Sequence, residues 1–174
     1  MSFDLCSGRA SFAWTVPADV EVTGPMKLRL HVEVRDADDA HLFVGVRKLR
    51  GRREIGFEGS YGYPFDTVTK GWLKASHRRL DPDRSEPWRP VHRHDAVEPL
   101  QPRSIAPVEI ELLPSAPLFR RGEVLRLDVQ GRWFFPRNPL VGQFPAAYAP
   151  SPDGTALLHC GGGFDAHLLV PLQP

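Results

Sequence analysis

The stretch PVEIELLPSAPLFRRGEVLRLDVQG, residues 107–131, decides the fold class of this chain. In its first half Val108, Ile110 and Leu112 alternate with glutamates, which predicts a strand with one apolar face and one charged face. The run PSAP at 114–117 is expected to end this strand, because proline lacks the amide donor that a β-ladder needs.

The second half of the same stretch predicts another strand. Leu125, Leu127 and Val129 form its apolar face, and Arg126 and Asp128 are expected to point to water. Two strands that each have one wet face favour an antiparallel sheet. We expect the rest of the chain to wrap around this pair.

The composition is that of an ordinary soluble globular protein, with 174 residues, 41% hydrophobic and 25% charged. A formal net charge of +1 gives no long-range attraction to nucleic acid or to an anionic membrane, and neither partner is expected. The basic run RKLRGRR at 47–53 is interpreted as the soluble face of a hairpin. Eighteen prolines and fifteen glycines separate short apolar runs, which is typical of a β-rich domain.

The N-terminal sequence and the cysteines favour a cytoplasmic location. The first residues, MSFDLCSGRA, have neither the basic region nor the apolar region of a secretory signal. No apolar run approaches the ~20 residues that span a bilayer. Cys6 and Cys160 could pair if the terminal strands were neighbours, but two reduced thiols are the simpler interpretation.

Alternation predicts further strands along the chain, most clearly over 26–35, where apolar residues occupy every even position. Other strand-like runs lie at 11–16, 42–49, 72–77, 156–160 and 167–171. Two proline-rich connections, 81–107 and 137–154, separate them, and no long apolar stripe at helical spacing occurs. A sandwich of two antiparallel sheets is the economical architecture.

The sequence lacks the motif of a self-contained hydrolase. Acyl-transfer enzymes hold a nucleophilic serine on a tight turn with the pattern G-x-S-x-G. The nearest stretch here is GSYG at 59–62, but Glu58 precedes it and no helical pattern follows. Stray serines and histidines do not indicate a triad, because almost any sequence contains them. We therefore expect no catalytic residue in this chain, and no cofactor.

Two groups of residues match metal sites only in part. His92 and His94 would share one face of a strand, as a metal pair does, but they lie in a proline-rich connection without a convincing third ligand. We interpret them as polar loop residues. Asp36, Asp38 and Asp39 lack the glycine and the distal glutamate of a calcium loop, so a solvated acidic turn is the simpler interpretation. No metal site is expected.

Aromatic side chains indicate the surface best suited to a partner. Trp72, Trp88, Trp133, Phe134 and Phe135 could stack on a sugar or pack in the core or against another domain. These interpretations stay open at this point. The first four of these side chains, with the two histidines above, form the candidate interdomain or ligand surface.

Four collinear segments carry a family resemblance. They are VTGPMKLRLHVEVRDADDAHLFVGVRKL (22–49), GWLKASHRRLDPDRSEPWRPVHRH (71–94), PLQPRSIAPVEIELLPSAPLFRRGEVLRLDVQG (99–131) and HCGGGFDAHLLVPLQP (159–174). In order and spacing they resemble the C-terminal domain of X-Pro dipeptidyl-peptidases and cocaine-esterase type (CocE/NonD) serine hydrolases. The resemblance covers the chain from about residue 11 onward, which is far more specific than a short motif.

The resemblance implies a jelly-roll β-sandwich of the galactose-binding-like kind, with residues 1–174 as a single domain and 1–10 as its lead-in. In such enzymes this domain follows an α/β-hydrolase domain that carries the catalytic serine, acid and histidine. The accessory domain packs on the hydrolase domain and helps to wall the substrate pocket. No position here matches the triad motifs, so no catalytic residue is carried over.

The chain departs from the family pattern at three places, one of which is the run RWFFP at 132–136, more apolar than is usual there. A Pro-Gly-Glu turn is typical where this chain has Pro102-Arg103-Ser104. Phe164 and Ala166 stand where a tyrosine and a serine are common near the last strand.

Three functions follow as hypotheses. The leading one is a non-catalytic β-sandwich domain of a serine hydrolase that cleaves esters or X-Pro peptide bonds. The alternative is a free-standing carbohydrate-binding module of the same fold, which rests on the aromatic residues and on fold analogy. A third is an assembly domain that forms a homo-oligomer through its apolar patch.

Overall fold

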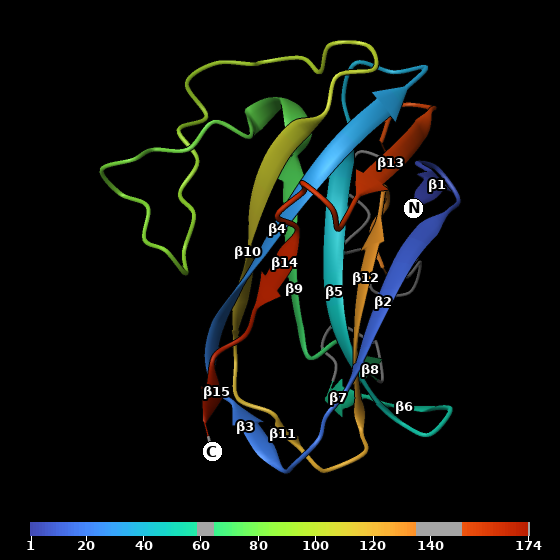
Figure 1. The fold of residues 1–174 in the computed structure, drawn as a ribbon, viewed down its shortest axis with the longest axis vertical. Helices are drawn as coiled ribbons and strands as arrows, with labels where there is room; N and C mark the ends of the chain where they lie inside the picture. The colour runs from blue at the N-terminus through green and yellow to red at the C-terminus, as the bar shows by residue number, and fades with distance from the viewer. Residues whose placement is uncertain (59–64, 135–150, 174) are drawn as a thin grey trace, which may run out of the picture.

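A computed structural model describes residues 1–58, 65–134 and 151–173, and these residues form a sandwich of two antiparallel sheets (Figure 1). Sheet A contains β1 (Ser2–Asp4), β13 (Thr155–His159), β4 (Gly24–Arg35), β10 (Ala106–Ser115) and β14 (His167–Leu169). Sheet B contains β2 (Arg9–Thr15), β12 (Val124–Gln130), β5 (His41–Arg50), β6 (Arg53–Ile55) and β9 (Thr69–Lys74). The sandwich predicted from the alternation is confirmed.

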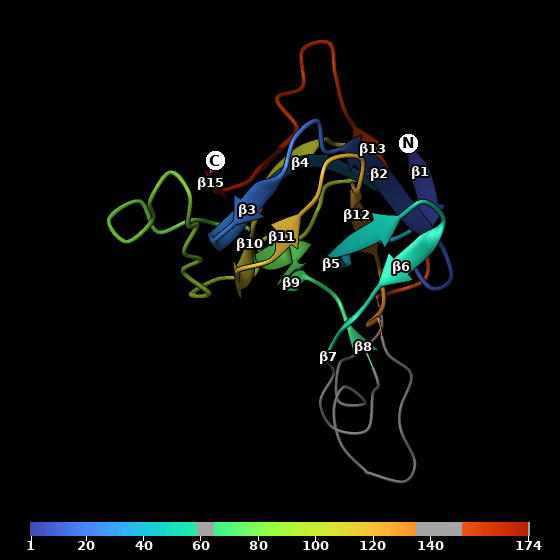
Figure 2. The same ribbon diagram turned by 90° about the horizontal axis from the view of Figure 1, so that it is seen from below.

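Two smaller ribbons lie toward one end of the sandwich (Figure 1). A three-stranded ribbon joins β11 (Leu118–Phe119), β3 (Val20–Val22) and β15 (Leu172–Gln173), and a second ribbon pairs β7 (Phe57–Glu58) with β8 (Phe65–Asp66). The connection between β13 and β14 projects on the side opposite β7 and β8 (Figure 2). Within the described residues the only helical element is the 3₁₀ turn η1 (Ala75–His77).

The apolar faces that the alternation predicts meet in the core. Along β4 the side chains of even number from Met26 to Val34 are all buried, as are Val108, Ile110 and Leu112 of β10. Sheet B contributes the apolar residues of β5 and β12 from the opposite side. Removal of these side chains from water supplies the main driving force for folding.

The two strands of the 107–131 stretch do not pair with each other, contrary to the expectation. β10 pairs with β4 in sheet A, whereas β12 lies between β2 and β5 in sheet B. The proline-containing run also ends the strand later than expected. β10 continues through Pro114 to Ser115, with a register shift after Leu112 that accommodates the irregular pairing. The connection 116–123 therefore crosses from one sheet to the other.

Asp128 does not face water, which corrects the second expectation for this stretch. Its side chain has no exposed surface. The carboxylate accepts hydrogen bonds from Arg47 Nε at 2.9 Å and from the Ser11 hydroxyl at 2.7 Å, and Arg126 and Arg9 approach it within 3.5 Å. A buried carboxylate is tolerated because these cations and hydrogen bonds replace water.

The basic run 47–53 is likewise more than a soluble hairpin face. Lys48 is buried, donates to the carbonyl of Leu118 at 2.6 Å and lies 2.9 Å from Glu123. Arg50 pairs with the other oxygen of Glu123 at 2.8 Å. Only the tip of the run, Arg50 to Arg53, is exposed throughout. These ion pairs hold β5 to the turn that precedes β12.

The two long sides of the sandwich differ. On one side β9 and β10 approach so closely that a Cβ atom on Gly71 would lie 2.1 Å from the carbonyl oxygen of Glu111. On the other side, between β2 and β14, two adjoining apolar cavities of about 240 and 400 Å³ reach toward the core, and both are lined by Trp14, Leu125 and Leu168. The sandwich is therefore closed along β9 and β10 and grooved along β2 and β14.

Replacement of Leu127 by alanine should lower the free energy of unfolding by about 2–5 kcal/mol, because the side chain is only 6% exposed and its loss leaves a cavity. Urea denaturation measures the effect. Lys74→Ala is the control, since its side chain is 46% exposed and its ion pair with Asp39 is worth at most about 1 kcal/mol. A midpoint unmoved by the leucine change would contradict the assignment of the inner face of β12.

Glu123 should make the stability depend on pH in the acid range. Burial by itself raises the pKa of this carboxyl, but the Arg120 amide and the side chains of Lys48 and Arg50 lower the pKa from 4.5 to about 2. A carboxyl whose pKa is lower in the folded state stabilises the fold above its unfolded pKa, and that contribution disappears as the pH falls from 4.5 toward 2.

Glu123→Gln should therefore cost about 3 kcal/mol at pH 7, because it leaves Lys48 buried without its counter-charge. The difference from the unsubstituted protein should shrink as the pH falls through this window. Denaturation curves at pH 7, 4 and 3 test this. A constant difference at all three values would show that Glu123 does not titrate with a lowered pKa.

Candidate functional site

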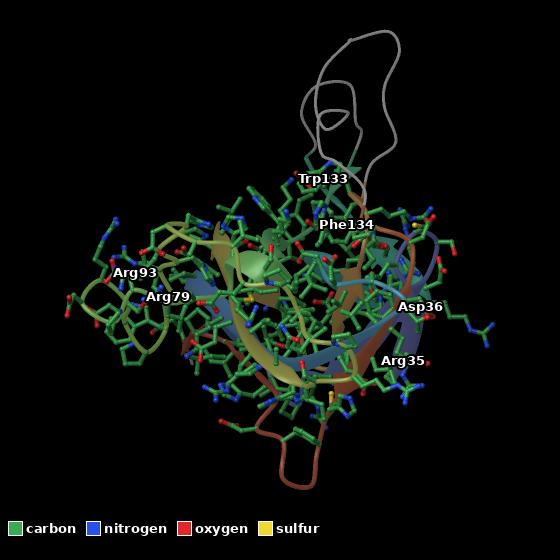
Figure 3. All side chains as sticks on the ribbon, turned by 90° about the horizontal axis from the view of Figure 1, so that it is seen from above. Arg35, Asp36, Arg79, Arg93, Trp133 and Phe134 are labelled. Carbon is green, nitrogen blue, oxygen red and sulfur yellow. The ribbon has the colours of Figure 1, made fainter. Side chains whose placement is uncertain are left out.

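Three of the predicted surface residues lie together on the outer face of sheet B. The ring centroids of Trp72 and Trp133 are 5.8 Å apart, and those of Trp133 and Phe134 are also 5.8 Å apart. Phe43 of β5 lies beneath them, with its ring 5.6 Å from that of Trp133 in an edge-to-face contact. Figure 3 shows Trp133 and Phe134 side by side on this face. We call these four residues the aromatic cluster.

The strands beneath the aromatic cluster explain its position. Gly45 leaves room for the ring of Phe134, since a Cβ atom there would lie 2.9 Å from a ring carbon. The guanidinium of Arg47 lies 5.7 Å from the centre of the same ring, and Lys70 lies 5.8 Å from the centre of the Trp133 ring. Such cation–π contacts add a modest attraction at partly exposed sites.

A pocket of about 220 Å³ lies between the aromatic cluster and the connection 81–107. It is lined by Lys70, Gly71 and Trp72 of β9, Glu111 and Leu113 of β10, and Pro90 and His92. Trp72, which is 45% exposed, therefore borders a recess that also contains two charged side chains and an imidazole. The structure thus brings Trp72 and His92 together, as the candidate surface requires.

The other predicted residues lie on the connection that follows η1, which extends to one side of the sandwich (Figure 1). His94 and Trp88 are exposed there, Trp88 to 52%. The ring of His92 lies 5.8 Å from that of His94. Burial, followed by the nearby charge of His94, lowers the pKa of His92 against the opposing effect of the Glu109 carbonyl and carboxylate.

The acidic turn differs in part from the expectation. Asp39 accepts hydrogen bonds from the amides of Ala40 and Ser76, both at 2.9 Å, so it organises the turn rather than remaining solvated as expected. Within 1–58, 65–134 and 151–173, no group of three or more His, Cys, Asp or Glu residues is placed to hold a metal ion. Cys6 and Cys160 are unpaired.

Two of the departures from the family pattern have structural consequences. Arg103 adopts a φ of +59°, a conformation that the usual glycine would reach without strain. The ring of Phe164 lies 5.2 Å from His31 and 5.1 Å from His159, so it covers the outer face of sheet A. Phe135 and the GSYG stretch at 59–62 lie outside the described residues.

Sequence reasoning missed the residues that complete the candidate surface. Phe43 was predicted as an ordinary strand residue, Lys70 lay outside every predicted strand, and Glu111 was one more polar position of an alternating strand. They reach the surface only because β5, β9 and β10 are neighbours, and no local pattern reveals that. What the arrangement provides is an apolar, partly exposed platform edged by charges, which is suited to packing or stacking.

Comparison with known proteins agrees with this picture. Residues 4–169 match the model of the X-Pro dipeptidyl-peptidase C-terminal non-catalytic domain. A CocE/NonD family hydrolase from Staphylococcus aureus superposes with a TM-score of 0.93 and 34% identity over 99% of this chain, which covers 32% of that hydrolase. An α-amino acid ester hydrolase superposes with a TM-score of 0.61 at 14% identity, over 95% of this chain and 25% of its own, and shows the fold alone.

Curated relatives give the same result. Proteins of Mycobacterium bovis and Mycobacterium tuberculosis that are named as serine esterases are 29% identical over 117 residues, which is 64% of this chain and 17% of theirs. The chain thus spans a third or less of the length of its relatives. None of the helical residues described in the structure forms a segment long and apolar enough to cross a membrane. The family match covers almost every strand of the sandwich, and the chain belongs to the family of X-Pro dipeptidyl-peptidase C-terminal non-catalytic domains.

Proposed function

We propose that this chain serves an α/β-hydrolase domain, on which it packs and whose substrate pocket it helps to wall. The enzyme so formed would hydrolyse esters or X-Pro peptide bonds. The observation that carries the proposal is the aromatic cluster, which lies on a face fixed by buried ion pairs and exposes nearly half of Trp72. The superposition on one third of a CocE/NonD hydrolase supports it, because the remaining two thirds of that protein have no counterpart here.

The chemistry of the aromatic cluster favours a protein partner. Tryptophan and phenylalanine bury large areas with little loss of side-chain entropy and are enriched in interface cores. Arg47 and Lys70 edge the cluster without interrupting it, as the polar rim of an interface does. Trp88, His92 and His94 would extend the same contact along the connection.

A carbohydrate-binding module remains the second candidate, because one observation favours it. The pocket beside Trp72 combines an exposed aromatic face with Lys70, His92 and Glu111, which suits a sugar ring and its hydroxyl groups. Calorimetric titration with common hexoses tests this. Absence of saturable binding, or binding unchanged in Trp72→Ala, would dismiss it.

For the location we propose the cytoplasm, where two unpaired thiols such as Cys6 and Cys160 stay reduced. A homo-oligomer is the third hypothesis. Light scattering of the purified chain at high concentration decides between it and a monomer.

The isolated chain should not hydrolyse p-nitrophenyl acetate or an X-Pro-nitroanilide above the rate of the buffer, since catalysis belongs to the partner domain. Absorbance at the wavelength of the released chromophore measures this directly. Hydrolysis that disappears on substitution of a serine would contradict the accessory role.

A chimera tests the packing face. In it this chain replaces the matching third of the Staphylococcus aureus hydrolase, and ester hydrolysis and thermal stability are measured. Trp72→Ala should lower the rate of ester hydrolysis about tenfold or more, or lower the melting temperature of the chimera, because a buried interface tryptophan typically contributes about 2 kcal/mol or more. Trp14→Ala is the matched control, since Trp14 is also partly exposed but lies at the β2 groove. Equal effects of the two changes would refute the assigned face.

A further inference from the structure

Two histidines, one at the end of η1 and one on the connection 81–107, lie in direct contact. His77 ends η1, and His94 lies 17 residues later, yet their Nδ1 atoms are 3.4 Å apart and their ring centroids 5.3 Å apart. The connection folds back to make this contact. The amide of Arg93 donates to the carbonyl of Arg79 at 3.0 Å, and Leu80 and His92 form a β-bridge.

The separation of the two nitrogens fits a shared ion. Two imidazole nitrogens that each lie about 2.0–2.1 Å from a tetrahedral metal are about 3.3–3.4 Å from each other. Imidazole is also the side chain that zinc, copper and nickel favour. In the absence of an ion, the same geometry allows one imidazole N–H to donate to the other ring.

Two further observations single out this place. His94 has a φ of +53°, in the left-handed region that residues other than glycine rarely adopt, and such strain concentrates at functional positions. The Nε2 atom of neighbouring His92 is buried and has no hydrogen-bond partner among the described residues. The backbone is therefore held in an unfavourable conformation that keeps three imidazoles together.

The positive charges beside the pair are partly balanced. Arg79 and Arg93, which lie between the two histidines in sequence, both face Asp95, at 4.0 and 2.9 Å (Figure 3 labels the two arginines on this lobe). The carboxylate offsets part of their positive charge. Both histidines approach the contact from exposed or half-buried positions, which leaves room for water to complete the coordination.

We propose that His77 and His94 bind one divalent transition-metal ion, which clips the connection to the end of η1. Water would fill the remaining coordination positions, so this is an open, two-histidine site and not a closed structural one. Binding would stabilise the folded connection, because a ligand that closes a loop of this length removes conformations from the unfolded chain.

Titration calorimetry on the tag-free, EDTA-treated chain tests the proposal with CuCl₂, NiCl₂ and ZnCl₂. We expect one saturable site of micromolar affinity, tightest for copper as the Irving–Williams order requires. The melting temperature should rise with metal and return with EDTA. MgCl₂ should not bind, because magnesium prefers oxygen ligands.

His77→Ala and His94→Ala should each weaken binding at least tenfold. His94→Asn is the second variant at that position, since asparagine tolerates a positive φ and removes the imidazole if the alanine variant folds poorly. His167→Ala is the control, because His167 is exposed and paired with Asp165. No saturable binding, or an equal loss in the His167 variant, would overturn the proposal.

Discussion

The outer face of sheet B depends on one buried charge. Asp128 is fully enclosed, and its carboxylate fixes the guanidinium of Arg47 at 2.9 Å. Arg47 in turn lies against the ring of Phe134, which rests on Gly45. A single carboxylate on the central strand thus orders the arginine on which the aromatic surface is built. Loss of that charge would free several cations at once, so the contact is cooperative.

The molecule separates stability from recognition. The alternating apolar residues of β4, β5, β10 and β12 form the core, and none of the candidate surface residues belongs to it. The proposed recognition surface lies on sheet B and on the connection after η1, where side chains are held by ring contacts and ion pairs instead. Substitutions at these surface residues should therefore cost the fold less than substitutions in the core.

Sequence reasoning predicted the strands well because period-two alternation is a local signal, as in 26–35 and in Val108 to Leu112. It failed where the answer depends on which strands are neighbours. Asp128 was predicted to be solvated because its partners Arg9 and Arg47 are distant in sequence. β2 and β5 bring these two arginines to it in the folded sheet. The candidate surface was predicted from residue type alone, and its completion by Phe43 and Lys70 needed the pairing of β5 with β9.

The contact at Gly71 has a mechanical consequence. The backbone of β9 lies against the carbonyl of Glu111, so the two sheets are in close contact along this edge. The groove between β2 and β14 leaves the opposite edge open. If the two sheets separate, they will rotate about the contact between β9 and β10, and the groove between β2 and β14 will widen. The interior of the sandwich is thus breached first beside Trp14, and the platform around Trp72 moves least.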